Sequence, residues 1–564
     1  MPSLIKKVKK GKAYYYAVQS GRVNGKPRIV WQKYLGSVES IIKKCEENSG
    51  SLPSETALFE AGGVAALLSI ANRIGLVEMI NELVPKREQG PSVGHYIVLA
   101  ALNRVLDPSS KTQIGDWYHN TVLQRLWHFP ADAFTSQRYW DHMGMVSQEV
   151  IQTIQNKLAE RIRKEFKIET QSLLYDTTNF FTYIDTHNHR NSIARRGHNK
   201  QKRTDLRQVN LALLTTQDFQ IPLFHMTYRG DIPDVKFFPE VAQNLLRRHE
   251  AICDNFHTTT LVFDKGNLSE ETIEQLLYSG MYFVAGVKAD MIPEVFAVPI
   301  DQFHNALKMP GTKFYETTVE LCSRTCNAIV SYSESFFTQQ LAALTASMAK
   351  CQNKLKELHS SLLSWTLEKK PKGPRPTMAK VRAKLKDILS GQYMQEVFTI
   401  TLNEFDGLPY LHYSINREGL EQLTSTRLGR TLLITNRTNW LPSEVISTYR
   451  DLGNIEDAFK HMKNRDYLRW QPAFHWTDQK IEVHTFYCVL ALLLATLARK
   501  MACEAGHEFS LVMLLDDLSA IKEVALLYPT GEGSARAKFT LSRMTPRQKK
   551  LAECFSIGDL LAVG

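Results

Sequence analysis

Apolar and polar positions follow two different periods along the chain, and the changes between these periods mark its segments. Residues 13–35 form two strand-like runs on either side of Asn24-Gly25, a dipeptide that is typical of β-hairpins. From about residue 55 to residue 165 the apolar residues recur at helical spacing, as in ALFEAGGVAALLSIANRIGLVEMINELV. We therefore predict a β-hairpin in residues 1–50 and an all-helical domain in residues 51–165.

The pattern changes to strands after residue 166. Three consecutive runs, SLLYDTTNFFTYI, QVNLALLTTQ and IPLFHMTY, are rich in the residues that favour strands. Helical and strand-like stretches then alternate up to about residue 290, from FFPEVAQNLLRRH to MYFVAGV. Three strands followed by alternating helices and strands predict an α/β fold with a mixed sheet and flanking helices.

Helical segments dominate residues 335–390, and three strand-like runs follow before residue 436. A single helix is then predicted over YRDLGNIEDAFKHMKNRDYLRW, residues 449–470. The run TFYCVLALLLATLA at residues 485–498 has 14 residues, fewer than the ~20 that cross a bilayer. We expect it to be a buried helix, expect no membrane partner, and predict a helical tail for residues 511–564.

Cationic residues are concentrated at the start of the chain. The 69 Lys and Arg residues exceed the 58 Asp and Glu residues, giving a net charge of +11. A basic segment of this kind binds polyanions by releasing counterions from phosphate groups, although a solvated tail has the same composition. Nine of the cations precede the first acid, Glu39: Lys6, Lys7, Lys9, Lys10, Lys12, Arg22, Lys26, Arg28 and Lys33.

Composition also bears on the location of the protein. The first residues, MPSLIKKVKKGKAYYYAV, carry charge but lack the apolar core of a signal peptide. The eight cysteines are scattered through 564 residues, which favours reduced thiols. We therefore expect a cytoplasmic protein that is built of several globular domains.

Two aspartates occupy unusual positions in the α/β region. Asp176 lies within the apolar strand SLLYDTTNFFTYI, where a carboxylate is costly unless it has a partner or faces a cleft. Asp264 ends the strand TTTLVF and precedes a turn into the next helix, so a helix cap is the alternative interpretation of this residue. Both aspartates are candidates for a site at one edge of the sheet.

Glu456 lies on the predicted helix, with Tyr449 seven residues before it and Lys463 seven residues after it. Seven residues are nearly two helical turns, so the three side chains form one polar line; an ordinary amphipathic helix is the alternative. If Glu456 meets Asp176 and Asp264, the carboxylates repel one another and a hard divalent cation relieves the repulsion. Two such ions activate the attacking oxygen and stabilise the leaving oxygen in phosphoryl transfer.

Together these residues resemble the bacterial insertion-sequence transposases of the DDE type, in the subgroup whose glutamate helix carries a Tyr-Arg-Glu-Lys signature. Asp176 in LLYDTTNF matches the first acid, Asp264 in LVFDKGN the second and Glu456 in GNIEDAFKHMK the third. The resemblance extends to GRVNGKPRIVWQKYLG, NRVLDPSSK and RWQPAFHWTDQKIEVHTFYCVLALLL, and it covers most of the chain.

The resemblance implies a ribonuclease-H-like catalytic core, with residues 166–290 as its first part and residues 426–510 as its second part. The gap between Asp264 and Glu456 is far too long for a direct connection, so residues 291–425 are expected to be a large insertion. The basic hairpin and the helical domain precede this core and are expected to contact DNA, the helical domain at the DNA ends.

The resemblance also implies a function. The protein would be a transposase that binds the inverted-repeat ends of its element as double-stranded DNA, cuts them and joins them to target DNA. Two Mg²⁺ ions, for which Mn²⁺ substitutes, would be held by the catalytic residues Asp176, Asp264 and Glu456. A homodimer on paired ends and a nucleoid-associated place in a bacterial cytoplasm are implied as well. A catalytically inactive DNA-binding regulator and a metal-dependent nuclease without strand transfer are the alternatives.

Several basic residues are candidate DNA contacts. Tyr449 and Lys463 match signature positions that the resemblance assigns to DNA, whereas the arginine position holds Leu452. Arg450, two residues earlier, is the candidate to replace that arginine. Residues 187–208 contain seven Lys or Arg residues and one acid, which predicts a loop that guides a DNA backbone. The loop residues that we expect to bind DNA are Arg195, Arg196, Lys200, Lys202 and Arg203.

Overall fold

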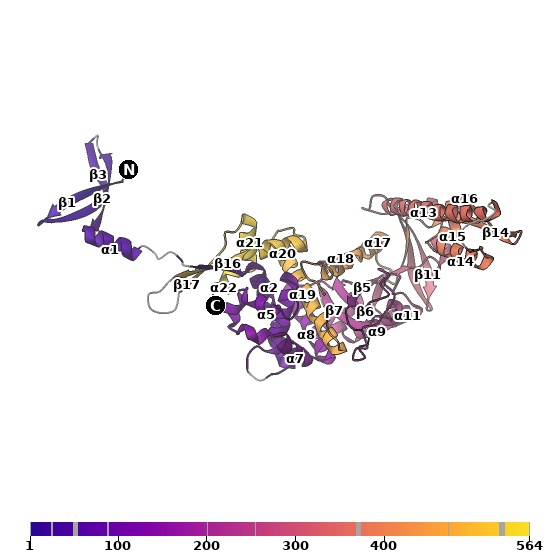
Figure 1. The fold of residues 1–564 in the computed structure, drawn as a ribbon, viewed down its shortest axis with the longest axis horizontal. Coiled ribbons are helices and arrows are strands. Elements are labelled where there is room, and N and C mark those ends of the chain that lie inside the picture. Colours follow the sequence, from indigo (N-terminus) through magenta and orange to yellow (C-terminus); the bar gives the residue numbers. More distant parts are fainter. Residues whose placement is uncertain are drawn as a thin grey trace.

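The computed structural model shows a mixed α/β fold with a large mixed sheet and many helices (Figure 1). A small N-terminal unit lies at one end of the long axis, the body lies in the middle, and a projecting unit lies at the other end. The structure describes residues 2–23, 26–48, 53, 55–86, 89–185, 187–199, 201–253, 255–367, 374–471, 473–528 and 536–562.

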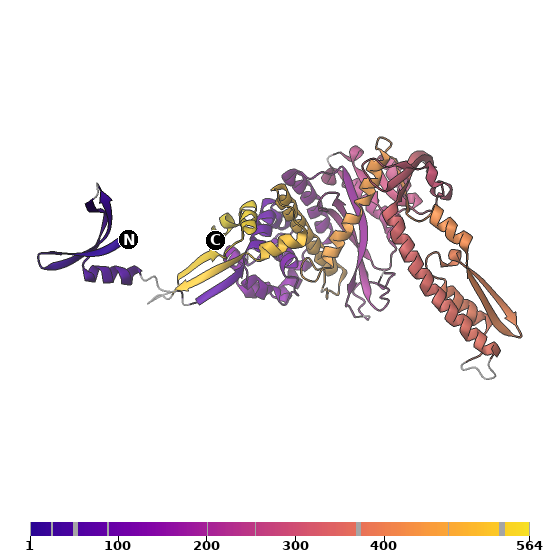
Figure 2. The same ribbon diagram turned by 90° about the horizontal axis from the view of Figure 1, so that it is seen from above.

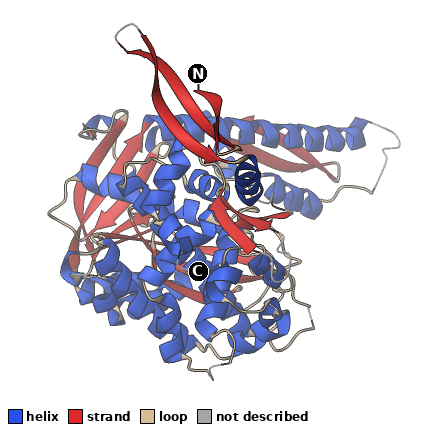
Figure 3. Cartoon of the chain, turned by 90° about the vertical axis from the view of Figure 1, so that its left-hand side faces the viewer, coloured by secondary structure: helices blue, strands red, loops and turns tan. Residues whose placement is uncertain are grey.

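The N-terminal unit is an antiparallel sheet of three strands followed by a helix. Its elements are β1 (Pro2–Lys9), β2 (Lys12–Val23), β3 (Lys26–Gly36) and α1 (Val38–Asn48). The predicted strands around Asn24-Gly25 are β2 and β3, and the dipeptide itself lies outside the described residues. β1 is an additional strand that pairs with β2 along its whole length, and its lysines hide the alternation by which strands are recognised. Figure 3 shows these strands projecting from the body.

Residues 51–165 contain mainly helices and begin with a strand. The strand β4 (Glu55–Glu60) pairs with β16 (Lys522–Tyr528), which pairs with β17 (Arg536–Leu541) in a separate small sheet. The helices are α2 (Gly62–Arg73), α3 (Leu76–Leu83), α4 (Val93–Leu106), α5 (Ile114–His119), α6 (Leu123–Trp127), the 3-10 helix η1 (Ala131–Phe134), α7 (Ser136–Gly144) and α8 (Gln148–Phe166).

Residues 511–564, which the sequence predicts as a helical tail, contain strands as well as helices, so that prediction is corrected here. The strands β16 and β17 lie between α20 (Leu511–Ser519) and the last two helices, α21 (Pro546–Cys554) and α22 (Ile557–Ala562). β16 is a strand because it pairs with β4, which lies more than 450 residues earlier in the chain. Local periodicity does not reveal a partner that is so distant in the sequence.

The long apolar helix α19 (Asp478–Glu504) runs through the body. By length and composition alone it could cross a membrane, and 94% of its most apolar window is buried inside the protein. It packs against α2, α4 and α8. The prediction of a buried helix at residues 485–498 is therefore confirmed.

The main sheet has nine strands in the order β10-β11-β12-β15-β9-β8-β5-β6-β7. At one side β5 (Ser172–Thr182), β6 (Arg207–Thr216) and β7 (Pro222–Arg229) are antiparallel neighbours. Next to β5 lie β8 (Thr260–Phe263) and β9 (Tyr282–Val287), both parallel to it. The sequence pattern of three strands followed by alternating helices and strands is thus confirmed as one mixed sheet.

The helices of this part connect the strands. They are α9 (Asp234–Arg247), α10 (His249–Ile252), the 3-10 helix η2 (Phe256–Thr258), α11 (Glu270–Ser279), α12 (Pro293–Phe296) and the 3-10 helix η3 (Ile300–Gln302). Aromatic side chains from the helices pack on the strands: Phe238 of α9 contacts Tyr175 of β5 and Phe263 of β8, with ring centroids 4.4 and 4.8 Å apart. This packing fixes the two strands at the point where each reaches an aspartate.

Residues 291–425 contribute both to the main sheet and to the projecting unit. β10 (His304–Asn305), β11 (Thr312–Leu321) and β12 (Arg324–Ser333) extend the main sheet, which β15 (Arg430–Thr435) joins between β12 and β9. The projecting unit, residues 334–428, has its own apolar core, and Figure 2 shows its long helix leaving the sheet. It comprises α13 (Glu334–Leu367), α14 (Met378–Ile388), α15 (Met394–Val397), the hairpin β13 (Phe398–Phe405) and β14 (Leu408–Ile415), and α16 (Arg417–Thr426).

The predicted helix over residues 449–470 is two helices instead of one. α17 (Pro442–Arg450) ends just before α18 (Gly453–Met462), and Lys463 is the C-cap of α18. Between them the backbone N–H groups of Leu452 and Ile455 bond three residues back, at 3.1 and 3.2 Å, rather than four. This tighter turn breaks the α-helical ladder, and the single-helix prediction is therefore wrong.

Candidate active site

Asp176 and Asp264 are neighbours across two parallel strands. Tyr175 of β5 is in register with Phe263 of β8, so the next residue on each strand, the aspartate, lies beside the other. Parallel strands are about 4.8 Å apart, which brings both half-buried carboxylates to one edge of the sheet. The helix-cap alternative for Asp264 does not apply, because the cap of α11 is Ser269, whose side chain accepts from the Thr272 N–H.

Glu456 lies in the first turn of α18 and is exposed. It lines a cleft of about 600 Å³ together with Asp176 and Asp264. A second cleft of about 710 Å³ is also lined by Asp176 and Glu456, and it continues toward Lys463 at the end of α18. The two clefts therefore adjoin at Asp176 and Glu456, and we refer to them together as the groove.

Tyr449 is a direct partner of one of these acids. Its Oη donates a hydrogen bond of 2.7 Å to Asp264 Oδ1. Burial, followed by the charge of Asp264, raises the pKa of the Tyr449 hydroxyl, so it remains a donor at neutral pH. The ring fits only because β9 has Gly286 at this point: a Cβ there would lie 2.3 Å from Tyr449 Oη.

Lys463 lies at the end of α18 and reaches back to the strand of Asp176. Its Nζ donates to Thr178 Oγ1 at 2.6 Å and lies 5.5 Å from the centre of the Phe180 ring. The Phe180 ring is itself stacked on Trp470, with ring centroids 4.8 Å apart. The cation is thus held in the wall of the second cleft.

Arg450 and Leu452 both line the first cleft. The Arg450 Nη2 donates to Thr312 Oγ1 at 3.0 Å, and burial lowers the pKa of its guanidinium, which nevertheless stays charged. Leu452 is only 8% exposed and belongs to the main apolar core. The position that matches the signature arginine is therefore a packing position here, and Arg450 is the cation at this wall.

Residues 187–208, which we name the basic loop, lie beside the second cleft. Arg195 is tied to Gln208 by two backbone hydrogen bonds of 3.0 and 2.8 Å, and Arg203 forms a 2.7 Å ion pair with Asp205. The side chains of Arg196, Lys202 and Arg203 are exposed, whereas Arg195 is half-buried. Lys200 lies outside the described residues.

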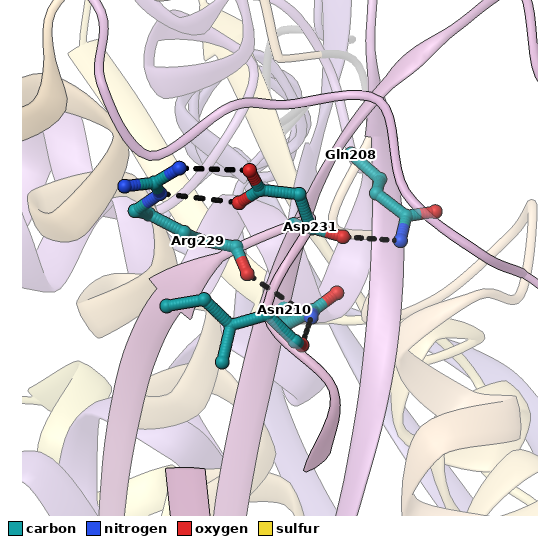
Figure 4. Close-up of polar contacts among 6 residues, drawn as sticks. Gln208, Asn210, Arg229 and Asp231 are labelled. Carbon is teal, nitrogen blue, oxygen red and sulfur yellow. Dashed lines mark hydrogen bonds and ion pairs between the residues drawn. The ribbon is translucent and has the colours of Figure 1, made fainter. Parts of the chain in front are cut away.

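A set of polar contacts joins the start of β6 to the end of β7 and the residues that follow it (Figure 4). Gln208 Nε2 donates to the Gly230 carbonyl at 2.8 Å, and Asn210 Nδ2 donates to the carbonyls of Arg229 and Ile232, both at 3.2 Å. Arg229 in turn pairs with Asp231 at 2.7 Å. Asn210, Gly230 and Asp231 line the second cleft, so these contacts form part of its wall.

The sequence does not single out the hydroxyl groups that line the first cleft. Ser331 and Ser333 of β12 and Thr431 of β15 line it beside the aspartates. The available signal was the alternation of serines in SYSES, residues 331–335, which places them on one face of a strand.

Carboxylate oxygens are the ligands that Mg²⁺ prefers, so the donor atoms of this groove suit that ion. The geometry fits in part. Asp176 and Asp264 are side by side, and Glu456 lies in the same cleft. Within the part of the chain that the structure describes, no group of three His, Cys, Asp or Glu side chains is close enough to hold an ion together.

No family model and no curated protein matches the chain. Among solved structures, it is similar to a chain of the cryo-EM structure of the piggyBac transposase synaptic complex with hairpin DNA. The TM-score is 0.35 and the sequence identity 10%, over 83% of this chain and 82% of that chain. The function is therefore inferred from the geometry of the groove.

Proposed function

We propose that this chain is a DNA transposase of the DDE type that binds the inverted-repeat ends of a bacterial insertion sequence, cuts them and joins them to target DNA. The observation that carries the proposal is the cleft itself: Asp176, Asp264 and Glu456 are far apart in the sequence and line one cleft. The strand order, three antiparallel strands beside two strands parallel to the first, supports a ribonuclease-H-like core around them.

Asp176, Asp264 and Glu456 would hold two Mg²⁺ ions, or Mn²⁺ in their place. When bound, the ions activate the attacking oxygen and stabilise the leaving oxygen of a phosphodiester. Tyr449 orients the Asp264 carboxylate through its hydrogen bond. Glu456, from the first turn of α18, would complete the set of carboxylate ligands in this cleft.

Cations on the two sides of the carboxylates would position the DNA backbone. Arg450 lines the first cleft and Lys463 the second, so their charges would contact phosphates on either side of the scissile bond. The exposed cations Arg196, Lys202 and Arg203 continue this track on the basic loop. A homodimer that pairs two ends in a bacterial cytoplasm is part of the proposal.

A catalytically inactive DNA-binding regulator is the second candidate, and one observation favours it. The position of the signature arginine holds Leu452, which is packed in the core. A metal-dependent nuclease that cuts without joining would need the same carboxylates, and only a strand-transfer assay distinguishes it from a transposase.

The test is cleavage of labelled end DNA in Mg²⁺ together with gel-shift binding. We expect Glu456→Gln, Asp176→Asn and Asp264→Asn each to lower the cleavage rate by roughly three orders of magnitude or more while specific binding survives. The matched control is Asp457→Asn, the neighbour of Glu456 on α18, whose carboxylate pairs with Lys460 at 2.7 Å. Near-normal cleavage by Glu456→Gln would remove the catalytic assignment. Binding without any cleavage by the unmodified chain would favour the regulator.

A further inference from the structure

Two large aromatic side chains stand exposed beside each other on the surface of the body. Phe474 is 61% exposed and Trp476 is 55% exposed, whereas the residues that alternate with them, Ala473 and His475, are 1% and 6% exposed. This alternation is the two-residue period of an extended chain. We name Phe474 and Trp476 the aromatic pair.

The residue between the two rings holds them outward. His475 Nε2 lies 2.9 Å from Lys111 Nζ and 3.2 Å from His484 Nδ1, and Lys111 also donates to the Tyr487 hydroxyl at 2.7 Å. Burial lowers the pKa of His475, so its neutral ring accepts from Lys111. Because this anchor is buried, it fixes the backbone from which the two exposed rings extend, and Trp140 packs against Trp476 with ring centroids 5.8 Å apart.

The basic loop runs alongside the aromatic pair. Asn188 Nδ2 donates to the Trp476 carbonyl at 3.2 Å, and its Oδ1 accepts from the N–H of the exposed Arg190 at 2.8 Å. Asp478 lies two residues after Trp476, and its carboxylate accepts hydrogen bonds from the backbone N–H groups of Ser192 and Ile193, at 2.8 and 3.0 Å. The acid two residues after Trp476 is therefore engaged by the loop, and the exposed Arg190 lies two residues after Asn188, the loop residue that contacts Trp476.

The aromatic pair lies beyond the far end of the strand that carries Asp176. Gln471 Nε2 donates to the Phe181 carbonyl near the end of β5 at 3.4 Å. From Asp176 to the end of β5 at Thr182 the strand covers about 20 Å, at ~3.3 Å per residue. A DNA strand that passes the carboxylates and Lys463 would meet the pair about six nucleotide steps later.

We propose that the aromatic pair is a binding site for unpaired bases of a DNA strand whose phosphates lie along the basic loop. Side chains two residues apart on an extended chain are about 6.7 Å apart, twice the ~3.4 Å spacing of stacked bases, so one base fits between the rings. Charge favours a polyanion as the occupant, and the flat exposed rings favour bases over an intact duplex. This inference rests on the proposed function, which supplies cut strands at the groove.

The experiment uses the full chain without divalent ions and a 12-nucleotide single strand that carries one 2-aminopurine. We expect stacking to quench the 2-aminopurine fluorescence, and Phe474→Ala or Trp476→Ala each to weaken binding about tenfold. The double variant Phe474→Ala/Trp476→Ala should lose the quenching altogether. The single variant Trp476→Phe, which keeps an aromatic ring, should retain most of it. The matched control is Tyr278→Ala, which removes a ring that is 89% exposed on α11.

Each outcome decides between stacking and its alternatives. Unchanged quenching by the double variant overturns the inference, and if that variant still binds and cuts end DNA the proposed function stands. If the double variant loses single-strand and duplex binding to the same extent, the inference is overturned as well, because a stacking site for unpaired bases discriminates between single-stranded and duplex DNA. If the unmodified chain binds neither form of DNA, the proposed function fails together with the inference. Thermal unfolding of every variant verifies that the fold is intact.

Discussion

Gly286 and Tyr449 show how a single missing side chain shapes the groove. The tyrosine comes from α17 and the glycine from β9, and the space that a Cβ would occupy on Gly286 is filled by the Tyr449 hydroxyl and ring edge. The hydroxyl reaches Asp264 only through that space. The orientation of the carboxylate therefore depends on a residue that carries no chemistry of its own.

This dependence predicts a specific coupling between the two positions. Gly286→Ala should displace the Tyr449 hydroxyl and slow end cleavage about tenfold, the effect of losing a hydrogen bond to a charged group of about 1.5 kcal/mol. In a Tyr449→Ala background the same change should cost nothing further, because the space is already empty. The measurement is a double-mutant cycle on the cleavage rate. An equal loss in both backgrounds would mean that the extra Cβ strains β9 itself.

Among single residues of the site, the sequence reveals those whose type conflicts with the residues around them. Asp176 stands out because it is an acid in an apolar strand, and the structure places it beside Asp264. Gly286 and Ser331 do not stand out, because a glycine or a serine in a strand acquires its role only from what lies across the fold. Leu452 could be recognised as a departure from the signature, but not as a core residue.

At the scale of elements, α19 combines an apolar middle with a polar start. Near its beginning Glu482 is mostly buried, and this burial, followed by the charges of Asp478 and Glu149, raises the pKa of its carboxyl to about 7. The folded chain therefore binds this proton more tightly than the unfolded chain does. The stability that the protonated carboxyl contributes is present below pH 4.5, the ordinary pKa, and is lost as the pH rises toward 7.

We therefore predict that Glu482→Gln stabilises the protein at pH 8 and has little effect at pH 4. The expected gain at pH 8 is about 2 kcal/mol, on the scale of 1.36 kcal/mol for each unit of pKa. It would be measured as the difference in thermal unfolding midpoint between the two pH values. Glu508→Gln, an exposed carboxylate after the end of α19, is the control. A gain that is the same at both pH values would contradict the assignment.

Helices and strands could be predicted from the sequence where neighbouring residues alone carry the apolar pattern. The strands β5, β6 and β7 and the buried helix α19 follow from runs of apolar residues. β1 and β16 did not, because the lysines of β1 interrupt its apolar alternation and β16 needs β4 as its partner. The division between α17 and α18 also escapes a periodicity argument, because three-residue and four-residue hydrogen bonds leave nearly the same spacing of apolar residues.

At the scale of the whole molecule, the N-terminal unit stands apart from the body (Figure 1). Almost none of it is buried: Val18 is 1% exposed, whereas Leu4, Val8 and Trp31 are 61%, 64% and 48% exposed. A sheet with so little core and nine cations in its sequence fits a unit that acts by contacting a polyanion.

Deleting residues 1–48 should weaken binding to end DNA and make the dependence of log K on log salt shallower. The slope should fall by about 0.9 for each phosphate contact that is lost. The measurement is gel-shift affinity at several salt concentrations, with Lys354→Gln/Lys356→Gln, two exposed cations on the projecting unit, as the control. An unchanged slope after the deletion would contradict a DNA role for the N-terminal unit.

The projecting unit leaves the main sheet and returns to it at adjacent points. The Ser333 N–H donates to the Gly429 carbonyl at 2.9 Å. The chain therefore leaves the main sheet and returns to it at two neighbouring residues. A segment attached in this way can be acquired or discarded in one genetic event, because the strands on either side already meet and nothing needs to be rethreaded. We therefore expect that a change in the length of the projecting unit leaves the carboxylates beside its point of attachment in place.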